Sequence, residues 1–197
     1  MAARRRLLLI VAALAVTAGT ATACTEANGT NGKNYVPGDG AVIEIDPSDR
    51  GEPVELSGET LTGDQVDLAD RRGSVVVVNV WWAGCPPCRK EAPLLVDASD
   101  ELPGGGTVLG INIRDSSKDN ALAFERGFEV PYPSIYDPGS RLLLNFPPPF
   151  NPRDMPSTVV LDAQGRVAAL IRGEIPSKLT LIDLAEKVAA EDGLIDG

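Results

Sequence analysis

The sequence contains no histidine, and it has only 3 cysteines among its 197 residues. The lack of histidine excludes zinc and haem sites with imidazole ligands, and it excludes catalysis by a Ser-His or Cys-His pair. Positive charge is also scarce, because 18 Lys and Arg stand against 28 Asp and Glu, for a formal net charge of −10. Nucleic-acid binding needs clustered Lys and Arg, so we expect no nucleic-acid partner.

The first residues have the pattern of a secretory signal peptide. Three arginines at residues 4–6 precede an apolar run over residues 7–18, and small residues lead to Ala21-Thr22-Ala23. The apolar run is shorter than the roughly 20 residues that comfortably span a bilayer. We therefore interpret residues 1–23 as a cleaved signal peptide, with an uncleaved signal anchor as the alternative.

Cys24 directly follows this predicted cleavage site. The arrangement resembles a bacterial lipobox, in which the cysteine after the cut receives a lipid, and we expect lipid attachment at Cys24; simple secretion is the alternative. Residues 25–40 are rich in Gly, Asn and Thr, so we expect residues 24–52 to form a flexible tether. The protein would then lie on the extracytoplasmic face of a bacterial cell membrane, and Cys85 and Cys88 would remain as a self-contained pair.

Residues 53–192 are expected to form one α/β domain, with a central sheet flanked by helices and an N-terminal β-hairpin extension. The pattern of apolar residues predicts strands over residues 54–56, 65–68, 75–80, 107–113, 134–136, 158–162 and 167–172, and helices over residues 89–102, 118–127 and 177–190. The first two strands form the hairpin, and the others follow in the order βαβα and then ββα, with the short strand over residues 134–136 between the two groups.

The segment Cys85-Pro86-Pro87-Cys88 carries the chemistry. It lies between a predicted buried strand and the start of a helix, where backbone N–H groups and the helix dipole lower the pKa of the first cysteine below the free value of about 8.5. Cys85 is then the attacking thiol, and Cys88, one helical turn further on, resolves the mixed disulfide. The two prolines stiffen the loop and hold the sulfurs within reach of each other.

Other interpretations of the cysteine pair are weaker. A structural zinc site needs four Cys or His ligands, and an inert disulfide across so short a loop would contribute little stability. A peroxidase would carry Thr three residues before the reactive cysteine, where this chain has Trp82. Binding of copper(I) by the two thiolates remains the non-enzymatic alternative. We expect no resident metal and no cofactor.

Two segments resemble one known family. Residues 75–91, VVVVNVWWAGCPPCRKE, and residues 155–162, MPSTVVLD, followed by Gly165-Arg166, resemble the TlpA/ResA-like (DsbE-like) branch of the thioredoxin superfamily. The resemblance covers residues 53–190. It implies a thioredoxin fold and a membrane-tethered thiol–disulfide oxidoreductase of the bacterial cell envelope.

The resemblance also implies residue roles. Cys85 corresponds to the nucleophile, Cys88 to the resolving thiol, and Pro156 to a cis-proline that faces them. The backbone of Met155 would then lie beside the disulfide and pair with an extended substrate strand. Glu91 matches a carboxylate that lies near the active site and tunes the thiols, and a solvated helix charge is the alternative.

The chain departs from the family at three places. Gly84 stands where the family commonly has Trp, which should leave the disulfide more open. Asn79 replaces the buried Asp of thioredoxins proper, and because an amide cannot shuttle protons, a proton role shifts to Glu91 or water. The proline-rich residues 146–152 should form a stiff loop that shapes one wall of a substrate groove. The side chains expected to contact substrate are those of Trp82, Pro86, Pro87 and Met155.

The resemblance favours a reductase that keeps selected envelope thiols reduced, such as those of apocytochrome c before haem attachment (cytochrome c-type biogenesis). Its partners would be protein thiols or disulfides and a CcdA-like membrane thiol carrier that supplies electrons. An oxidant that introduces disulfides into exported proteins would use the same residues. The two differ in reduction potential, which ranges from about −270 mV for thioredoxin to about −120 mV for a strong oxidant.

Overall fold

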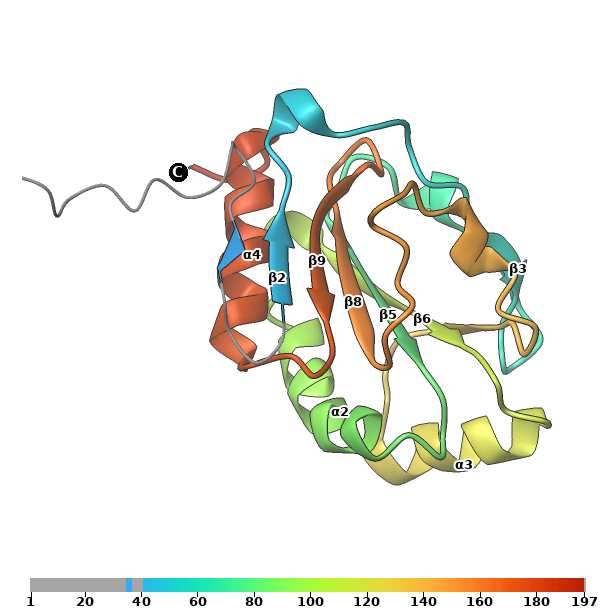
Figure 1. Ribbon diagram of the computed structural model, residues 1–197. Helices are drawn as coiled ribbons and strands as arrows, with labels where there is room; N and C mark the ends of the chain where they lie inside the picture. Colours follow the sequence, from blue (N-terminus) through green and yellow to red (C-terminus); the bar gives the residue numbers. More distant parts are fainter. Residues whose placement is uncertain (1–34, 37–40, 197) are drawn as a thin grey trace, which may run out of the picture. The chain divides into compact units, whose positions relative to one another are not determined.

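The computed structural model describes residues 35–36 and 41–196 of the chain (Figure 1). The predicted signal peptide, Cys24 and most of the predicted tether lie outside the described residues. Within the described part, no helix is long and apolar enough to cross a membrane.

Seven strands form one mixed sheet in the order β1-β2-β9-β8-β5-β6-β7, and two more form a separate hairpin, β3-β4. The strands are β1 (Tyr35–Val36), β2 (Ala41–Glu44), β3 (Ser57–Glu59), β4 (Gln65–Asp67), β5 (Val76–Trp81), β6 (Thr107–Asn112), β7 (Ser134–Tyr136), β8 (Ser157–Leu161) and β9 (Val167–Arg172). The α-helices are α2 (Pro86–Ser99), α3 (Lys118–Phe128) and α4 (Lys178–Glu191), and the 3-10 helices are η1 (Pro47–Asp49), η2 (Leu68–Arg71), η3 (Pro103–Gly105) and η4 (Leu142–Asn145).

Strand β5 lies at the centre of the sheet and is buried along its whole length. It pairs in parallel with β6 and antiparallel with β8. A strand covered on both faces is expected to be a continuous run of apolar, β-branched residues, and β5 fits this except for Asn79 and the aromatic Trp81. Its C-terminal end leads directly to the cysteine segment.

Each face of the sheet has its own apolar core. Helices α2 and α4 pack together on one face, where Leu95 and Leu181 meet the sheet. The segment around the β3-β4 hairpin covers the other face, with Leu56 and Leu68 fully buried against the strands. In Figure 1, α2 and α3 lie at the lower end of the sheet, where β5 ends and β8 begins.

The structure corrects three sequence-based boundaries. Helix α2 begins at Pro86 and ends at Ser99, three residues earlier at each end than the predicted range of 89–102. The first strand of the hairpin is Ser57–Glu59 rather than residues 54–56, because Val54 and Leu56 turn into the core while the Leu56 carbonyl accepts a hydrogen bond from the Leu68 N–H. The folded part also begins before residue 53. Strand β2 pairs with β9 in the main sheet, so the predicted tether ends before residue 41 rather than at residue 52.

Arg50 fastens this N-terminal segment to the rest of the fold. Its buried guanidinium donates to the Asp162 carboxylate at 3.2 Å and forms a second ion pair with Glu191 on α4. Asp162 also accepts from the Arg166 side chain at 2.7 Å. Sequence patterns missed this buried cluster because its members are far apart along the chain.

Replacing Arg50 by alanine tests how much the cluster stabilises the fold. We expect Arg50→Ala to lower the free energy of unfolding by about 3 kcal/mol, because the buried Asp162 carboxylate loses a cationic partner. Urea unfolding of the oxidised protein, followed by tryptophan fluorescence, measures the change. Lys187→Ala, which removes an ion pair with Glu44 from a side chain that is 49% exposed, is the control and should cost less than about 1 kcal/mol. Equal losses in the two variants would contradict the prediction.

Candidate active site

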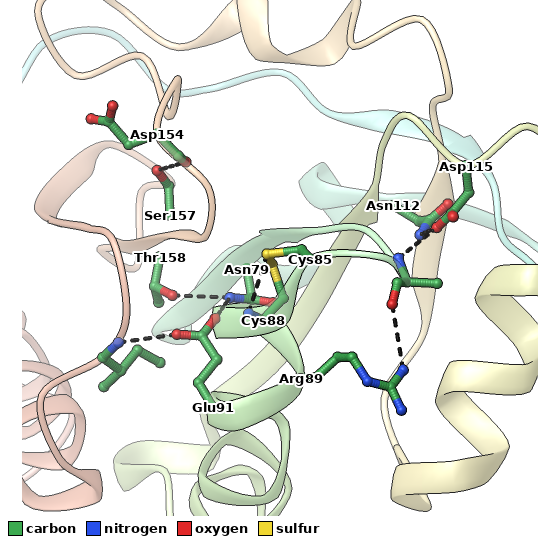
Figure 2. Close-up of a disulfide and its surroundings, with 12 residues drawn as sticks. Asn79, Cys85, Cys88, Arg89, Glu91, Asn112, Asp115, Asp154, Ser157 and Thr158 are labelled. Carbon is green, nitrogen blue, oxygen red and sulfur yellow. Dashed lines mark hydrogen bonds between the residues drawn. A yellow bond between two sulfur atoms is a disulfide. The ribbon is translucent and has the colours of Figure 1, made fainter.

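Cys85 and Cys88 are joined by a disulfide at the N-terminal end of α2 (Figure 2). Cys85 is the N-cap residue, and its sulfur accepts a hydrogen bond from the Cys88 N–H at 3.2 Å. Pro86 and Pro87 occupy the first two helical positions and have no N–H group, so Cys88 supplies the first backbone donor of the helix. Both cysteines are only 2% exposed.

The segment that precedes β8 brings a second element to the disulfide. The peptide bond between Met155 and Pro156 is cis, as predicted, and a further cis bond joins Pro148 and Pro149. The Met155 side chain packs against the apolar cluster that contains Cys85 and Cys88. Residues that are far apart in the sequence therefore meet at one end of the sheet.

The arrangement of Trp82 and Gly84 contradicts the expectation that Gly84 leaves the disulfide more open. The Trp82 ring lies against Gly84, and a Cβ atom added at Gly84 would overlap this ring. Trp82 also packs against the cluster that contains both cysteines. The missing side chain at Gly84 therefore does not leave the disulfide more open, because a tryptophan two residues earlier fills the space.

The other predicted contact residues differ in exposure. Pro86 is exposed, Pro87 is half-buried, and Gly84, directly before Cys85, is exposed. These residues form the accessible rim of the disulfide, whereas the sulfur atoms lie below it. Within the described residues, no three Cys, Asp or Glu side chains are grouped so that they could hold a metal ion.

Glu91 lies on the buried side of α2, and its side chain is not a solvated charge. Its carboxylate accepts hydrogen bonds from the Asn79 amide at 2.9 Å and from the Ile175 N–H at 3.0 Å. The Asn79 amide also donates to the Thr158 hydroxyl at 3.1 Å. Figure 2 shows this network of strands β5 and β8 and helix α2 beside the disulfide.

Burial raises the pKa of Glu91 from 4.5 to about 7. The hydrogen bonds from Ile175 and Asn79 act in the opposite direction, and the negative charge of Glu174 adds a small further increase. Asn79 and Cys88 line the same small cavity of about 10 Å³, which has room for about one water molecule. Glu91 is therefore a carboxyl that changes protonation near neutral pH and is linked through Asn79 to the cavity at Cys88.

Asp115 is a functional candidate that the sequence analysis missed. Its buried carboxylate accepts from the Ala83 N–H and from the Asn112 amide, both at 2.8 Å, and so fixes the turn before Cys85. The Tyr136 hydroxyl in turn donates to the Asp115 carbonyl at 3.0 Å. The signal was indirect: β5 and β6 are parallel, so the residues after both strands meet at one edge of the sheet.

Arg89 holds the same turn from the other side. Its guanidinium donates to the Ala83 carbonyl at 3.4 Å and lies over the rings of Phe124 and Phe128 on α3, 5.6 and 5.2 Å from their centroids. This cationic side chain is therefore directed toward the turn and α3. Its stacking links α2, which carries the cysteines, to α3.

Comparison with known proteins agrees with this architecture. A model of the redoxin family matches residues 47–188. The thiol-disulfide oxidoreductase ResA of Bacillus subtilis is 23% identical over 61% of this chain and 65% of its own length. A DsbE homolog, a thiol:disulfide interchange protein of Paracoccus denitrificans, is 30% identical over 68% of this chain and 74% of its own.

A solved structure gives the same result. The secreted thiol-disulfide isomerase from Corynebacterium glutamicum is 34% identical, with a TM-score of 0.67, and the match covers 83% of this chain and 95% of that one. These likenesses confirm the predicted thioredoxin-like fold, with its mixed central sheet, flanking helices and N-terminal strand pair, and the predicted ResA/DsbE-type resemblance.

The raised pKa of Glu91 predicts how the protein's stability depends on pH. In the folded protein the carboxyl keeps its proton up to about pH 7, whereas in the unfolded chain it loses the proton near 4.5. The folded state therefore binds more protons in this window, and the contribution of Glu91 to stability falls as the pH rises through it. Glu91→Gln removes this titration. From about pH 5 to about pH 8, the stability of the variant relative to wild type should rise by on the order of 2 to 3 kcal/mol.

Urea unfolding of both oxidised proteins at the two pH values measures this difference. A difference that stays constant with pH would show that Glu91 has an ordinary pKa.

Asp115 gives a second prediction for the site. Asp115→Ala removes the acceptor of the Ala83 N–H and frees the turn before Cys85, so we expect the rate of disulfide exchange to fall about tenfold. Asp115→Asn keeps an oxygen acceptor and should stay within about threefold of wild type. Stopped-flow reduction of a peptide disulfide by the reduced protein measures both rates. Equal rates for the Ala variant and wild type would disprove a positioning role.

Proposed function

Because the chain belongs to the redoxin family, we propose that it is a thiol–disulfide oxidoreductase that reduces disulfides of envelope proteins through Cys85 and Cys88. The observation that carries this direction is the sparse stabilisation of the Cys85 sulfur. Among the described residues, one group donates a hydrogen bond to this sulfur, the Cys88 N–H. The nearby guanidinium of Arg89 is directed toward Ala83 and α3 instead.

The link between this observation and the direction of electron flow is thermodynamic. A strong oxidant owes its high reduction potential to a reduced form in which the thiolate is stabilised. Pro87 has no N–H group at the second helical position, which is one of the two positions that usually donate to the side chain of an N-cap residue. The reduced form therefore gains little extra stability, which supports a low potential and the role of a reductant.

In the proposed reaction, the Cys85 thiolate attacks one sulfur of a substrate disulfide and forms a mixed disulfide, and the first substrate thiolate leaves and takes a proton from solvent. Cys88 then loses its proton and attacks the Cys85 sulfur, which releases the second substrate thiolate. Glu91 is the proposed acceptor of the Cys88 proton, by way of a water molecule in the cavity that Asn79 and Cys88 line, while the Asn79 amide holds the Glu91 carboxylate in place. The second substrate thiolate also takes a proton from solvent, so the enzyme ends as the Cys85–Cys88 disulfide and the substrate as two thiols.

Substrate docking is proposed at the rim around the disulfide. An extended strand would pair with the backbone of Met155, before the cis-proline Pro156, while Trp82, Pro86 and Pro87 contact its side chains. The half-buried Met155 and Trp82 both pack on the cysteine cluster, which supports this arrangement. A paired strand would bring its cysteine over Cys85.

The cellular setting is also part of the proposal. We propose an extracytoplasmic enzyme held at the membrane by a lipid on Cys24, which draws electrons from a CcdA-like thiol carrier and reduces clients such as apocytochrome c. The similarity to the DsbE homolog and to ResA supports this setting. The similarity to the secreted thiol-disulfide isomerase from Corynebacterium glutamicum favours a second candidate function, in which the pair forms or rearranges disulfides in exported proteins.

The reduction potential of the Cys85–Cys88 pair distinguishes the two functions. We expect a value near or below the roughly −270 mV of thioredoxin, because the reduced form lacks a strongly stabilised thiolate. Equilibration of the exported protein in graded thiol buffers, followed by thiol trapping and mass spectrometry, measures it. A value near about −120 mV would overturn the reductase and favour the second function.

A further inference from the structure

A surface hollow of about 350 Å³ lies between the loop before β8 and the end of β9. It is distinct from the small cavity at Cys88, with which it shares no residue. The hollow is lined by Pro148, Pro149, Asn151, Arg153, Asp154 and Arg172. Four of these six side chains are polar, so it is suited to a polar ligand group.

The Arg172 guanidinium is held at the wall of this hollow. It donates to the Pro149 carbonyl at 2.8 Å, which ties the loop to the end of β9. The Asn151 amide fastens the same loop internally, by donating to the carbonyls of Leu143 and Phe146 at 3.2 and 2.6 Å. The backbone of the loop and the Arg172 guanidinium are therefore held in place before any ligand arrives, which lowers the entropic cost of binding.

The hollow carries a positive charge on a chain whose formal net charge is −10. Arg153 and Arg172 contribute two guanidinium groups, and Asp154 contributes one carboxylate. The Asp154 carboxylate is 62% exposed and 3.9 Å from the Arg172 Nε atom, so it compensates that cation only weakly. Within the part of the chain that the structure describes, the Arg153 guanidinium has no hydrogen-bond or ion-pair partner.

The hollow lies next to the proposed docking strand. Arg153 and Asp154 immediately precede Met155, and Arg172 is the cross-strand partner of Ser157, which follows Pro156. The Gly173 N–H also donates to the Pro156 carbonyl at 2.9 Å. Figure 2 shows Asp154 beyond Ser157, on the β8 side of the disulfide. A strand advances about 3.3 Å per residue, so a bound chain reaches the hollow within a few residues of its reacting cysteine.

We propose that this hollow is a subsite for an acidic side chain of the polypeptide substrate, an Asp or Glu about two to four residues from the reacting cysteine. The proposal rests on the proposed function, because it requires a polypeptide docked at Met155 with its sulfur at Cys85. Guanidinium groups match the planar carboxylate, so the subsite selects among clients without taking part in the thiol chemistry.

The test uses short peptides with blocked ends, a single cysteine and no other charge. Each peptide cysteine is joined to mercaptoethanol through a disulfide, and the reduced enzyme converts it to the peptide thiol and free mercaptoethanol while its own pair is oxidised. One Asp is placed at each position from four before to four after the cysteine, with an Asn peptide as the match. Chromatography of the released peptide thiol at low ionic strength gives kcat/KM for each pair.

We expect one or two neighbouring positions at which the Asp peptide reacts about three- to fivefold faster than its Asn match. Arg153→Ala should reduce this ratio to near one, and Arg153→Glu should invert it. Lys90→Ala is the matched control, since it also removes one cation near the cysteines from a side chain that is 74% exposed. It should leave the ratio unchanged.

The outcomes separate the two levels of the proposal. Equal rates for Asp and Asn peptides at every position would overturn the subsite and leave the proposed function intact. A loss of preference in Lys90→Ala as large as in Arg153→Ala would also overturn it, because the effect would then be general electrostatic steering. Failure of the wild-type enzyme to reduce any of the peptides would overturn the proposed function and the subsite with it.

Discussion

The site depends on the way in which strand β5 delivers the chain to the start of α2. Because β5 is buried along its whole length and paired on both sides, the position of its last residue, Trp81, is fixed by the core. The turn that follows is fixed separately, by the hydrogen bond that the Ala83 N–H donates to the Asp115 carboxylate. The hydrogen bond between the Cys88 N–H and the Cys85 sulfur is therefore made at a place that the fold defines, and the other parts of the site are arranged around it.

The buried polar network at Glu91 is the main exception to an apolar core near the disulfide. A carboxyl group in this position is costly when ionised, and the hydrogen bonds from Ile175 and Asn79 offset only part of the cost, so the balance leaves its pKa near neutrality. A purely structural role would be served better by an apolar side chain of similar size. The presence of a titrating group beside the Cys88 cavity connects the network to proton movement in the proposed reaction.

The parts of the site that the sequence predicts are those whose signal lies within a short stretch of chain. The β-branched run before the cysteines, the cysteine spacing and the Met155-Pro156 pair each act locally, and the structure has the strand, the disulfide and the cis bond at those places. Asp115 lacks such a signal, because its carboxylate gains its partner only when β5 and β6 lie side by side. Likewise, the Trp82 ring fills the space beside Gly84 only in a particular rotamer, and residue spacing does not specify that rotamer.

The residues that react and the residues proposed to recognise partners are also held in different ways. The residues that react are close together in sequence and are held by the core, so they leave little freedom for variation. The loop before β8 is held instead by a few polar contacts from Arg172 and Asn151, which fix its position without requiring a particular set of exposed side chains. A surface of this kind can change its charge without disturbing the disulfide. Selectivity among clients is therefore expected to reside in this loop, while the direction of electron transfer is set at the N-terminal end of α2.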